Sequence, residues 1–134
     1  NFTLNSSDTE LSSKMIEISN GIGHDIVFET AGASITPRLA INLTRKGGKT
    51  VLVGIYSSEP KMDFNEIVNF ERTVIGSVAA SPGDMQAAVH LLNEGKIIAD
   101  PLISGVVTLD NVIRDGYEEM NRGVKDVFRI LVKP

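Results

Sequence analysis

The stretch "HDIVFETAG", residues 24–32, decides the fold. Its apolar run, residues 26–28, is typical of a strand buried on both faces, and Thr30, Ala31 and Gly32 then remove nearly all side-chain bulk. Two further strands end in the same way, in "VLVGI" at 51–55 and in "VIGSVA" at 74–79. Taken singly, each ending is typical of a plain turn, because any connection from a strand to a helix favours glycine. Three in series weigh equally for plain turns and for one sheet edge where a ligand can reach backbone groups.

Helical patterns alternate with these strands. Helices are predicted near residues 8–18, 36–46, 63–71, 81–94 and 110–120, and strands at 25–30, 49–56, 72–80, 101–109 and 127–132. This alternation predicts an α/β fold, a partial doubly wound (Rossmann-like) parallel sheet with helices on both faces. From about residue 100 the pattern becomes strand, helix, strand, which indicates a different sheet.

Local residues predict where the helices begin and end. Ser7 and Glu10 have the spacing of a capping box, and Thr36 is a candidate cap with Pro37 in the first turn. Ser81 and Asp110 are predicted to begin the two later helices. The run "RKGG" is expected to end the second helix, with Arg45 and Lys46 at its negative end.

Composition excludes several classes of protein. The chain has 134 residues, 42% of them apolar, which is enough for one core. It has no cysteine, so disulfides and thiolate metal sites are excluded, and this absence fits a cytoplasmic protein. A net charge of −4 with no basic run argues against nucleic acid, and no apolar stretch is long enough to span a membrane.

The order of the motifs carries a resemblance that covers essentially the whole chain. "DIVFETAG", then "LTRKGGKTVLVGIY", "FERTVIGSV", "LLNEGKIIADPLIS" and "VFRILVKP" resemble the zinc-containing medium-chain alcohol and polyol dehydrogenases, nearest to sorbitol (iditol) and butanediol dehydrogenases. The resemblance implies the C-terminal portion of such an enzyme. Residues 1–100 would be part of its dinucleotide-binding domain, and residues 101–134 a segment that returns to its GroES-like catalytic domain. The first residue, Asn1 rather than Met, agrees with a piece of a longer protein.

The resemblance also implies half of a site for NAD or NADP. Thr30, Ala31 and Gly32 would face the adenosine half, and Val53, Gly54 and Ile55 the nicotinamide. Ser77, Val78 and Ala79 would offer backbone groups to the carboxamide, although some relatives carry Arg at the position of Ala79. Arg129 would reach the cofactor phosphates, for which bidentate contact suits arginine; a solvated strand residue is the alternative for it. The glycine turn that holds the pyrophosphate is absent, because "GIG" at 21–23 precedes a strand instead of opening a helix.

Catalytic residues are not expected in this chain. The family's zinc ligands, from Cys, His and an acidic residue, would lie in the other domain, and His24 and His90 show no ligand spacing. Glu29 is expected to be a cap or a ribose neighbour rather than an acid or base. The chain alone is therefore expected to be inactive, although the parent enzyme would take a small alcohol or polyol substrate and would be a homo-oligomer.

Two alternatives remain open on the sequence. One is a non-catalytic module that dimerises or binds a nucleotide. The other is half of a class I methyltransferase-like domain, in which a strand opening with "KGG" is followed by an antiparallel hairpin. The helical pattern between residues 63 and 71 and the later "DMQAAVHLLNEG" favour the dehydrogenase.

Overall fold

The computed structural model of the chain describes residues 2–6, 8–123 and 127–134. Contacts within the chain divide it into a first unit, Asn1–Ala79, and a second unit, Ala80–Pro134. The predicted boundary at residue 100 separates the domains of the dehydrogenases that the sequence resembles. It is a different kind of boundary from the division after Ala79, and it stays a prediction.

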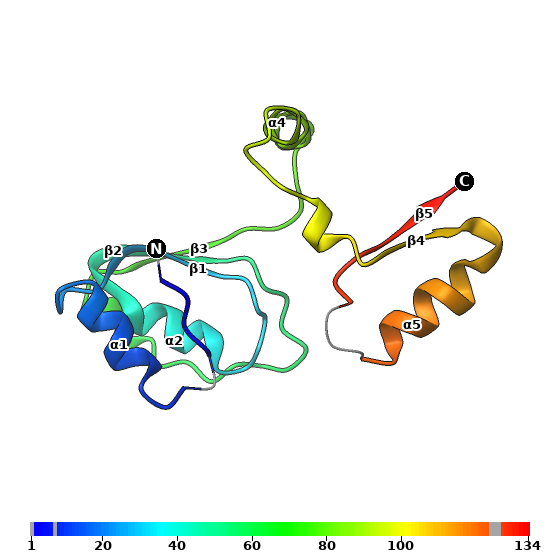
Figure 1. Cartoon of the computed structure of the whole chain (residues 1–134). Coiled ribbons are helices and arrows are strands. Elements are labelled where there is room, and N and C mark those ends of the chain that lie inside the picture. Colours follow the sequence, from blue (N-terminus) through cyan, green and yellow to red (C-terminus); the bar gives the residue numbers. More distant parts are fainter. Residues whose placement is uncertain (1, 7, 124–126) are drawn as a thin grey trace. The chain divides into compact units, whose positions relative to one another are not determined.

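The first unit contains a parallel sheet of three strands (Figure 1). Its strands β1 (His24–Glu29), β2 (Thr44–Leu52) and β3 (Thr73–Gly76) lie side by side in that order. This arrangement confirms the predicted parallel α/β architecture. After β2 the chain forms a short helix, α3 (Asn65–Val68), and returns as a parallel strand. The antiparallel hairpin of the methyltransferase-like alternative is therefore not formed at this point.

One face of the sheet carries the core of the first unit. Helices α1 (Leu11–Ile18) and α2 (Thr36–Leu43) lie on the same side of the sheet (Figure 1). The buried apolar side chains of the described residues all belong to α2: Pro37, Ala40, Ile41 and Leu43. Buried hydroxyls join this helix to the sheet, because Thr44 donates to the Ala40 carbonyl at 2.9 Å and lies 2.7 Å from the hydroxyl of Thr50. Both of these buried hydroxyls thus have a partner, which offsets their desolvation.

The other face of this sheet is apolar and open to solvent. Phe28 is paired with Val51 and Val51 with Ile75, so the three form one row across the strands. Phe28 is 64% exposed and Ile75 42%. The packing of a helix on this second face stays a prediction.

Two predicted boundaries of α2 are wrong. Ile35 occupies the N-cap position with no side-chain cap, because the Thr36 hydroxyl lies inside the helix and contacts the carboxylate of Glu29 instead. Pro37 lies in the first turn, as predicted. At the other end the chain becomes extended directly at Thr44, so Arg45 and Lys46 lie in β2 and not at the end of the helix.

The capping box predicted at the start of α1 consists of Ser7 and Glu10. Ser7 is not among the described residues. Glu10 stands at the N-cap position of α1, and its backbone N–H donates to the carboxylate of Asp8 at 2.9 Å. The Asp8 carboxylate also accepts from Lys14 at 2.7 Å, which lowers the pKa of Asp8.

In the second unit, α4 (Pro82–Asn93) begins and ends as the sequence predicts. Ser81 caps it in a reciprocal box, accepting from the backbone of Asp84 and donating its own N–H to that carboxylate at 2.8 Å. At the C-terminus Gly95 adopts a φ of 67°, its N–H bonds to Leu92, and Lys96 bonds to Leu91. This pair of bonds is a Schellman motif, which requires the left-handed conformation that glycine adopts easily.

A second, two-stranded sheet confirms that the last stretch belongs to a different sheet. It joins β4 (Gly105–Thr108) and β5 (Ile130–Lys133) in parallel. The remaining elements of this unit are two 3₁₀ turns, a π-helical segment and a last helix: η1 (Asp100–Leu102), η2 (Leu109–Asn111), η3 (Val112–Tyr117) and α5 (Glu118–Asn121).

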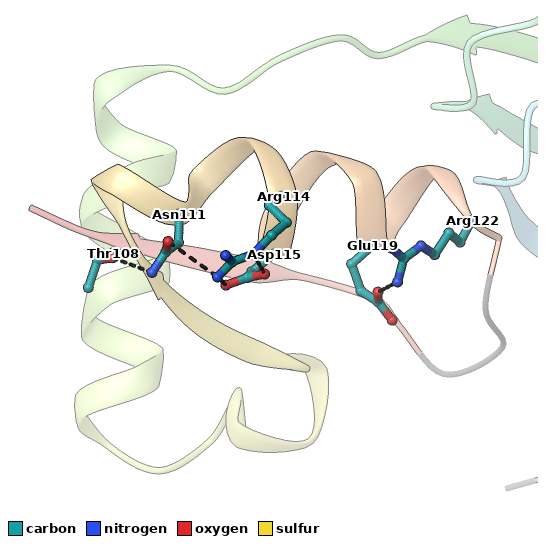
Figure 2. Close-up of polar contacts among 6 residues, drawn as sticks. All are labelled: Thr108, Asn111, Arg114, Asp115, Glu119 and Arg122. Atoms are coloured by element: carbon teal, nitrogen blue, oxygen red, sulfur yellow. Dashed lines mark hydrogen bonds and ion pairs between the residues drawn. The ribbon is translucent and has the colours of Figure 1, made fainter.

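The predicted cap at Asp110 is wrong. Asp110 lies inside η2, and the residue before that turn is Thr108, whose hydroxyl accepts from Asn111 at 3.2 Å (Figure 2). Arg114 then links Asn111 to the carboxylate of Asp115, which it contacts at 2.6 and 2.7 Å. This hydrogen bond from Arg114 lowers the pKa of Asp115. Such solvent-facing pairs contribute little to stability, so the network orients side chains more than it holds the fold.

None of the described helices is long and apolar enough to cross a membrane.

Candidate functional site

The carboxyl ends of the three parallel strands meet at one edge of the first unit. The backbone N–H of Val53 donates to the Glu29 carbonyl at 2.8 Å, and the N–H of Ser77 donates to the Leu52 carbonyl at 2.9 Å. Hydrogen bonding thus continues from the strands into the loops that follow them. The segments 30–32, 53–55 and 77–79 are consequently brought together, as the parallel sheet predicts.

Glycines allow the first two segments to touch backbone to backbone. A Cβ on Gly54 would lie 2.3 Å from the Gly32 nitrogen, and a Cβ on Gly32 would lie 2.4 Å from the Ile55 oxygen. Gly32 also has a φ of 66°, whereas Gly54 does not have a positive φ. Glycine is therefore needed at position 54 because a Cβ has no room there. At position 32 glycine is needed both because a Cβ has no room and because the backbone has a positive φ.

A buried carboxylate lies directly beneath this contact. Glu29, the last residue of β1, is 3% exposed. One of its oxygens, Oε1, accepts from the backbone N–H groups of Ala31 at 2.8 Å and Gly32 at 2.9 Å and from the Thr36 hydroxyl at 2.7 Å. Its other oxygen, Oε2, accepts from the hydroxyl of Tyr56 at 2.5 Å. Glu29 is thus a cap for its own loop, one of the roles expected from the sequence.

Hydrogen bonding decides the ionisation of this carboxylate. Burial raises the pKa of Glu29, but the bonds from Tyr56, Thr36, Gly32 and Ala31 outweigh burial and leave the pKa below its ordinary value. Burial, together with the hydrogen bond to the Glu29 carboxylate and its charge, raises the pKa of Tyr56 to about 12. At neutral pH the pair is therefore a carboxylate and a neutral phenol.

The outer surface of the edge is apolar and open. Ile55 is 85% exposed and Val78 81%, and Val53 is 40% exposed. Thr30 and Ala31 are exposed as well. Ala79 has a φ of 57°, an uncommon conformation for a residue that is not glycine. Exposed apolar side chains beside accessible backbone groups suit a flat ring that needs a few polar contacts.

Arg129 belongs to the second unit. It lies just before β5 and lines a shallow cavity of about 200 Å³ together with Val112, Gly116, Tyr117, Met120, Ile130 and Val132. The Arg129 carbonyl accepts from the backbone of Ser104 at 2.7 Å. The nine residues of segments 30–32, 53–55 and 77–79 gather in the first unit, and the assignment of Arg129 to the same site stays a prediction.

Within the described parts of the chain, no group of three or more His, Asp or Glu side chains could hold a metal ion. His90 lies 3.2 Å from Glu94, one turn away on α4. The buried Nε2 of His24 has no hydrogen-bond partner among the described residues. A zinc site, which takes three or four such ligands, does not fit the donor set of these residues.

Sequence reasoning missed Tyr56. Its hydroxyl is the one donor to the Glu29 carboxylate that comes from the β2 side, across 27 residues of sequence. Tyr56 follows Gly54 by two positions, and a polar aromatic residue at such a place is a weak pattern in itself. The acidic Glu29 at the end of the neighbouring strand is the signal that could have indicated a bond between the two side chains.

A family model described as zinc-binding dehydrogenase matches residues 1–94. A sorbitol dehydrogenase from Halalkalibacterium halodurans is 28% identical over 135 residues, which is 99% of this chain and 38% of that protein. An (R,R)-butanediol dehydrogenase from Bacillus subtilis is 34% identical over 114 residues, covering 85% of this chain and 32% of that protein.

Solved structures show the same likeness. The crystal structure of 2R,3R-butanediol dehydrogenase from Bacillus subtilis superposes with a TM-score of 0.82 at 31% identity, over 96% of this chain and 36% of that one. This chain spans about a third of the length of these relatives, between 32% and 38%. The matched model covers more than half of the chain, and the parallel sheet has the order expected for part of the fold. The chain belongs to the zinc-binding dehydrogenase family.

Proposed function

We propose that segments 30–32, 53–55 and 77–79 form part of the nicotinamide dinucleotide site of an alcohol or polyol dehydrogenase. The observation that carries the proposal is the backbone contact between Gly32 and Gly54 at the carboxyl ends of adjacent parallel strands. In open α/β sheets, ligands bind in the crevice outside these ends. Two of the relatives are a sorbitol dehydrogenase and an (R,R)-butanediol dehydrogenase, which supports a polyol as the substrate class.

The three segments divide the cofactor between them. Residues 30–32 contact the adenosine half, and the exposed Val53 and Ile55 lie against the nicotinamide. Residues 77–79 offer backbone groups to its carboxamide, and Arg129 binds the phosphates. An apolar surface on one side of a nicotinamide fits the 85% exposure of Ile55.

The whole enzyme would convert a secondary alcohol to a ketone. Hydride leaves the carbinol carbon for the nicotinamide ring, and the hydroxyl gives up a proton. This chain contributes binding surface to that reaction. No step through zinc follows from it, since the described residues do not offer a ligand set.

Titration with NADH tests the binding proposal on the chain itself. We expect saturable enhancement of nicotinamide fluorescence together with a rise in the thermal midpoint. A ligand at 100 times its dissociation constant adds about 2.7 kcal/mol to the stability of the folded state. A folded chain that shows neither change contradicts the proposal that these segments bind the cofactor without the rest of the enzyme.

A matched pair of variants locates the binding. Ile55→Asp places a negative charge at the strand-end segments, and we expect it to weaken NADH binding by repulsion of the phosphates. Ile22→Asp makes the same change at a 69% exposed isoleucine before β1, at the opposite end of the strand. Equal weakening by both variants would assign the binding to another surface.

Catalysis by the chain alone is tested separately, with a polyol, NAD⁺ and Zn²⁺ and with absorbance at the NADH band as the readout. We expect no turnover. A non-catalytic nucleotide-binding module would also bind NADH saturably without turnover. This result therefore does not separate such a module from part of a dehydrogenase, and the two hypotheses differ only in the parent protein. A homo-oligomer and a cytoplasmic location remain predictions from the family resemblance and the cysteine-free sequence.

A further inference from the structure

The two oxygens of the Glu29 carboxylate serve two different loops. Oε1 binds Ala31, Gly32 and Thr36, which all follow β1 along the chain. Oε2 binds the hydroxyl of Tyr56, which follows β2. A single side chain therefore joins the loop after the first strand to the loop after the second.

The backbone of Glu29 makes a second connection in the same direction. Its carbonyl accepts from the N–H groups of both Val53 and Gly54, at 2.8 and 3.1 Å. The loop after β2 is thus held at its beginning through the backbone and two residues later through Tyr56. Gly54, one of the two residues held through the backbone, also touches the backbone of Gly32.

A buried carboxylate costs free energy, so it is a poor way to stabilise a fold if stability is its only role. Burial disfavours the charged form, and hydrogen bonds have to offset that cost. Bonds to a charged acceptor are, however, shorter and stronger than bonds between neutral groups. A short, strong bond suits a group whose task is to fix a distance.

We propose that Glu29 and Tyr56 are a positioning pair that fixes the loop at 53–55 against the loop at 30–32. The meaning of the pair for the cofactor rests on the function proposed above. In that setting the pair sets the spacing between the adenosine side and the nicotinamide side of the cradle, and it does so without touching the cofactor.

The variant Tyr56→Phe removes the bond to Oε2 and keeps the aromatic ring. Thr36→Val is the matched control, because it removes a bond to the other oxygen of the same carboxylate. Tyr117→Phe controls for the loss of a hydroxyl at the second tyrosine, which is 68% exposed and belongs to the second unit. All three changes are close to isosteric.

Amide hydrogen exchange measured by NMR reads the pair without any ligand. In Tyr56→Phe we expect exchange at Val53 and Gly54 to rise by about tenfold or more, the effect of losing a bond to a charged acceptor. In Thr36→Val we expect those two amides to stay within about twofold of the wild type. If both variants change these amides alike, the pair is merely stabilising and the inference is overturned.

NADH binding then separates this inference from the function on which it rests. If the wild type binds, we expect Tyr56→Phe to weaken binding at least several-fold more than Thr36→Val does. Equal affinities for the two variants overturn the positioning role. If the wild type does not bind NADH, the function proposed for the chain alone fails, and the exchange comparison still decides whether Tyr56 holds the loop.

Discussion

At Gly54 a single added methyl group would collide with the neighbouring loop. Its Cβ would lie 2.3 Å from the Gly32 nitrogen and 2.6 Å from the Glu29 carboxylate. Gly76 ends the next strand and is the natural control, because a Cβ there meets no atom within 4 Å and neither glycine has a positive φ. The two positions therefore differ in space and not in conformation.

We predict that Gly54→Ala lowers the free energy of unfolding by about 1–3 kcal/mol, as overpacking does elsewhere. Gly76→Ala is expected to leave it unchanged or to raise it by about 0.4–1 kcal/mol, through the lower entropy of the unfolded chain. Urea unfolding of both variants measures the difference. Equal values for the two would mean that the loops separate easily, against the close contact described here.

Glu29 and Tyr56 make the stability of the first unit depend on pH at both ends of the scale. The pKa of Glu29 is lowered, so its contribution is present above its ordinary value of 4.5 and is lost as pH falls through the lower folded value. The pKa of Tyr56 is raised from 10.0 to about 12, so its contribution is complete below pH 10 and is lost as pH rises toward 12.

We therefore predict that the difference in unfolding free energy between wild type and Tyr56→Phe is constant near neutral pH and shrinks between pH 10 and pH 12. The difference isolates Tyr56, because all other groups titrate in both proteins. Urea unfolding at a series of pH values measures it, with Tyr117→Phe as the control. A difference that stays the same up to pH 12 would contradict the proposed bond to the carboxylate.

At the scale of elements, strands and their order follow from the sequence more readily than caps do. Apolar runs bounded by glycine predicted β1, β2 and β3 in the right order, because burial on both faces demands such runs. Their bounds were less accurate, because β2 begins at Thr44 rather than residue 49 and β3 ends at Gly76 rather than residue 80. Thr36 was predicted as a cap because threonine often is one, yet its hydroxyl bonds to a carboxylate from another element. A local pattern does not contain that competing acceptor.

The candidate site likewise has one part that could be predicted from the sequence and one part that could not. The gathering of the strand ends could be predicted, since the carboxyl ends of parallel strands share an edge. The contact of Gly32 with Gly54 and the bond from Tyr56 to Glu29 could not, because both depend on how two loops approach in three dimensions. The two faces of the sheet also differ in a way that the uniformly apolar strands do not reveal.

Burial separates two apolar residues of the first unit that are similar in size and hydrophobicity. Ile41 on α2 is 0% exposed, and Phe28 on the open face of the sheet is 64% exposed. We predict that Ile41→Ala costs about 2–5 kcal/mol of stability and Phe28→Ala about 0.5 kcal/mol or less. Phe28→Ala should also reduce the binding of a dye such as ANS. A large loss of stability in Phe28→Ala would show that its face is covered in solution.

At the scale of the whole molecule, the chain has a small core and much exposed apolar surface. The buried apolar side chains of the described residues come from a single helix, whereas large apolar residues are exposed in both units, among them Phe28, Ile75 and Leu131. Extended exposed apolar surface marks places where other protein packs. The relatives that this chain matches are about three times as long.

The division into two units predicts that a substitution that destabilises one unit leaves amide exchange in the other unit unchanged. Ser81→Ala removes the capping box of α4 and is expected to cost about 1 kcal/mol. Because the elements of each unit contact mainly one another, amide exchange should rise in Pro82–Asn93 and stay unchanged in β1, β2 and β3. Ile41→Val, which costs about 0.5–1.5 kcal/mol, should do the reverse. Exchange that rises in both units for either variant would show that the two units do not unfold independently.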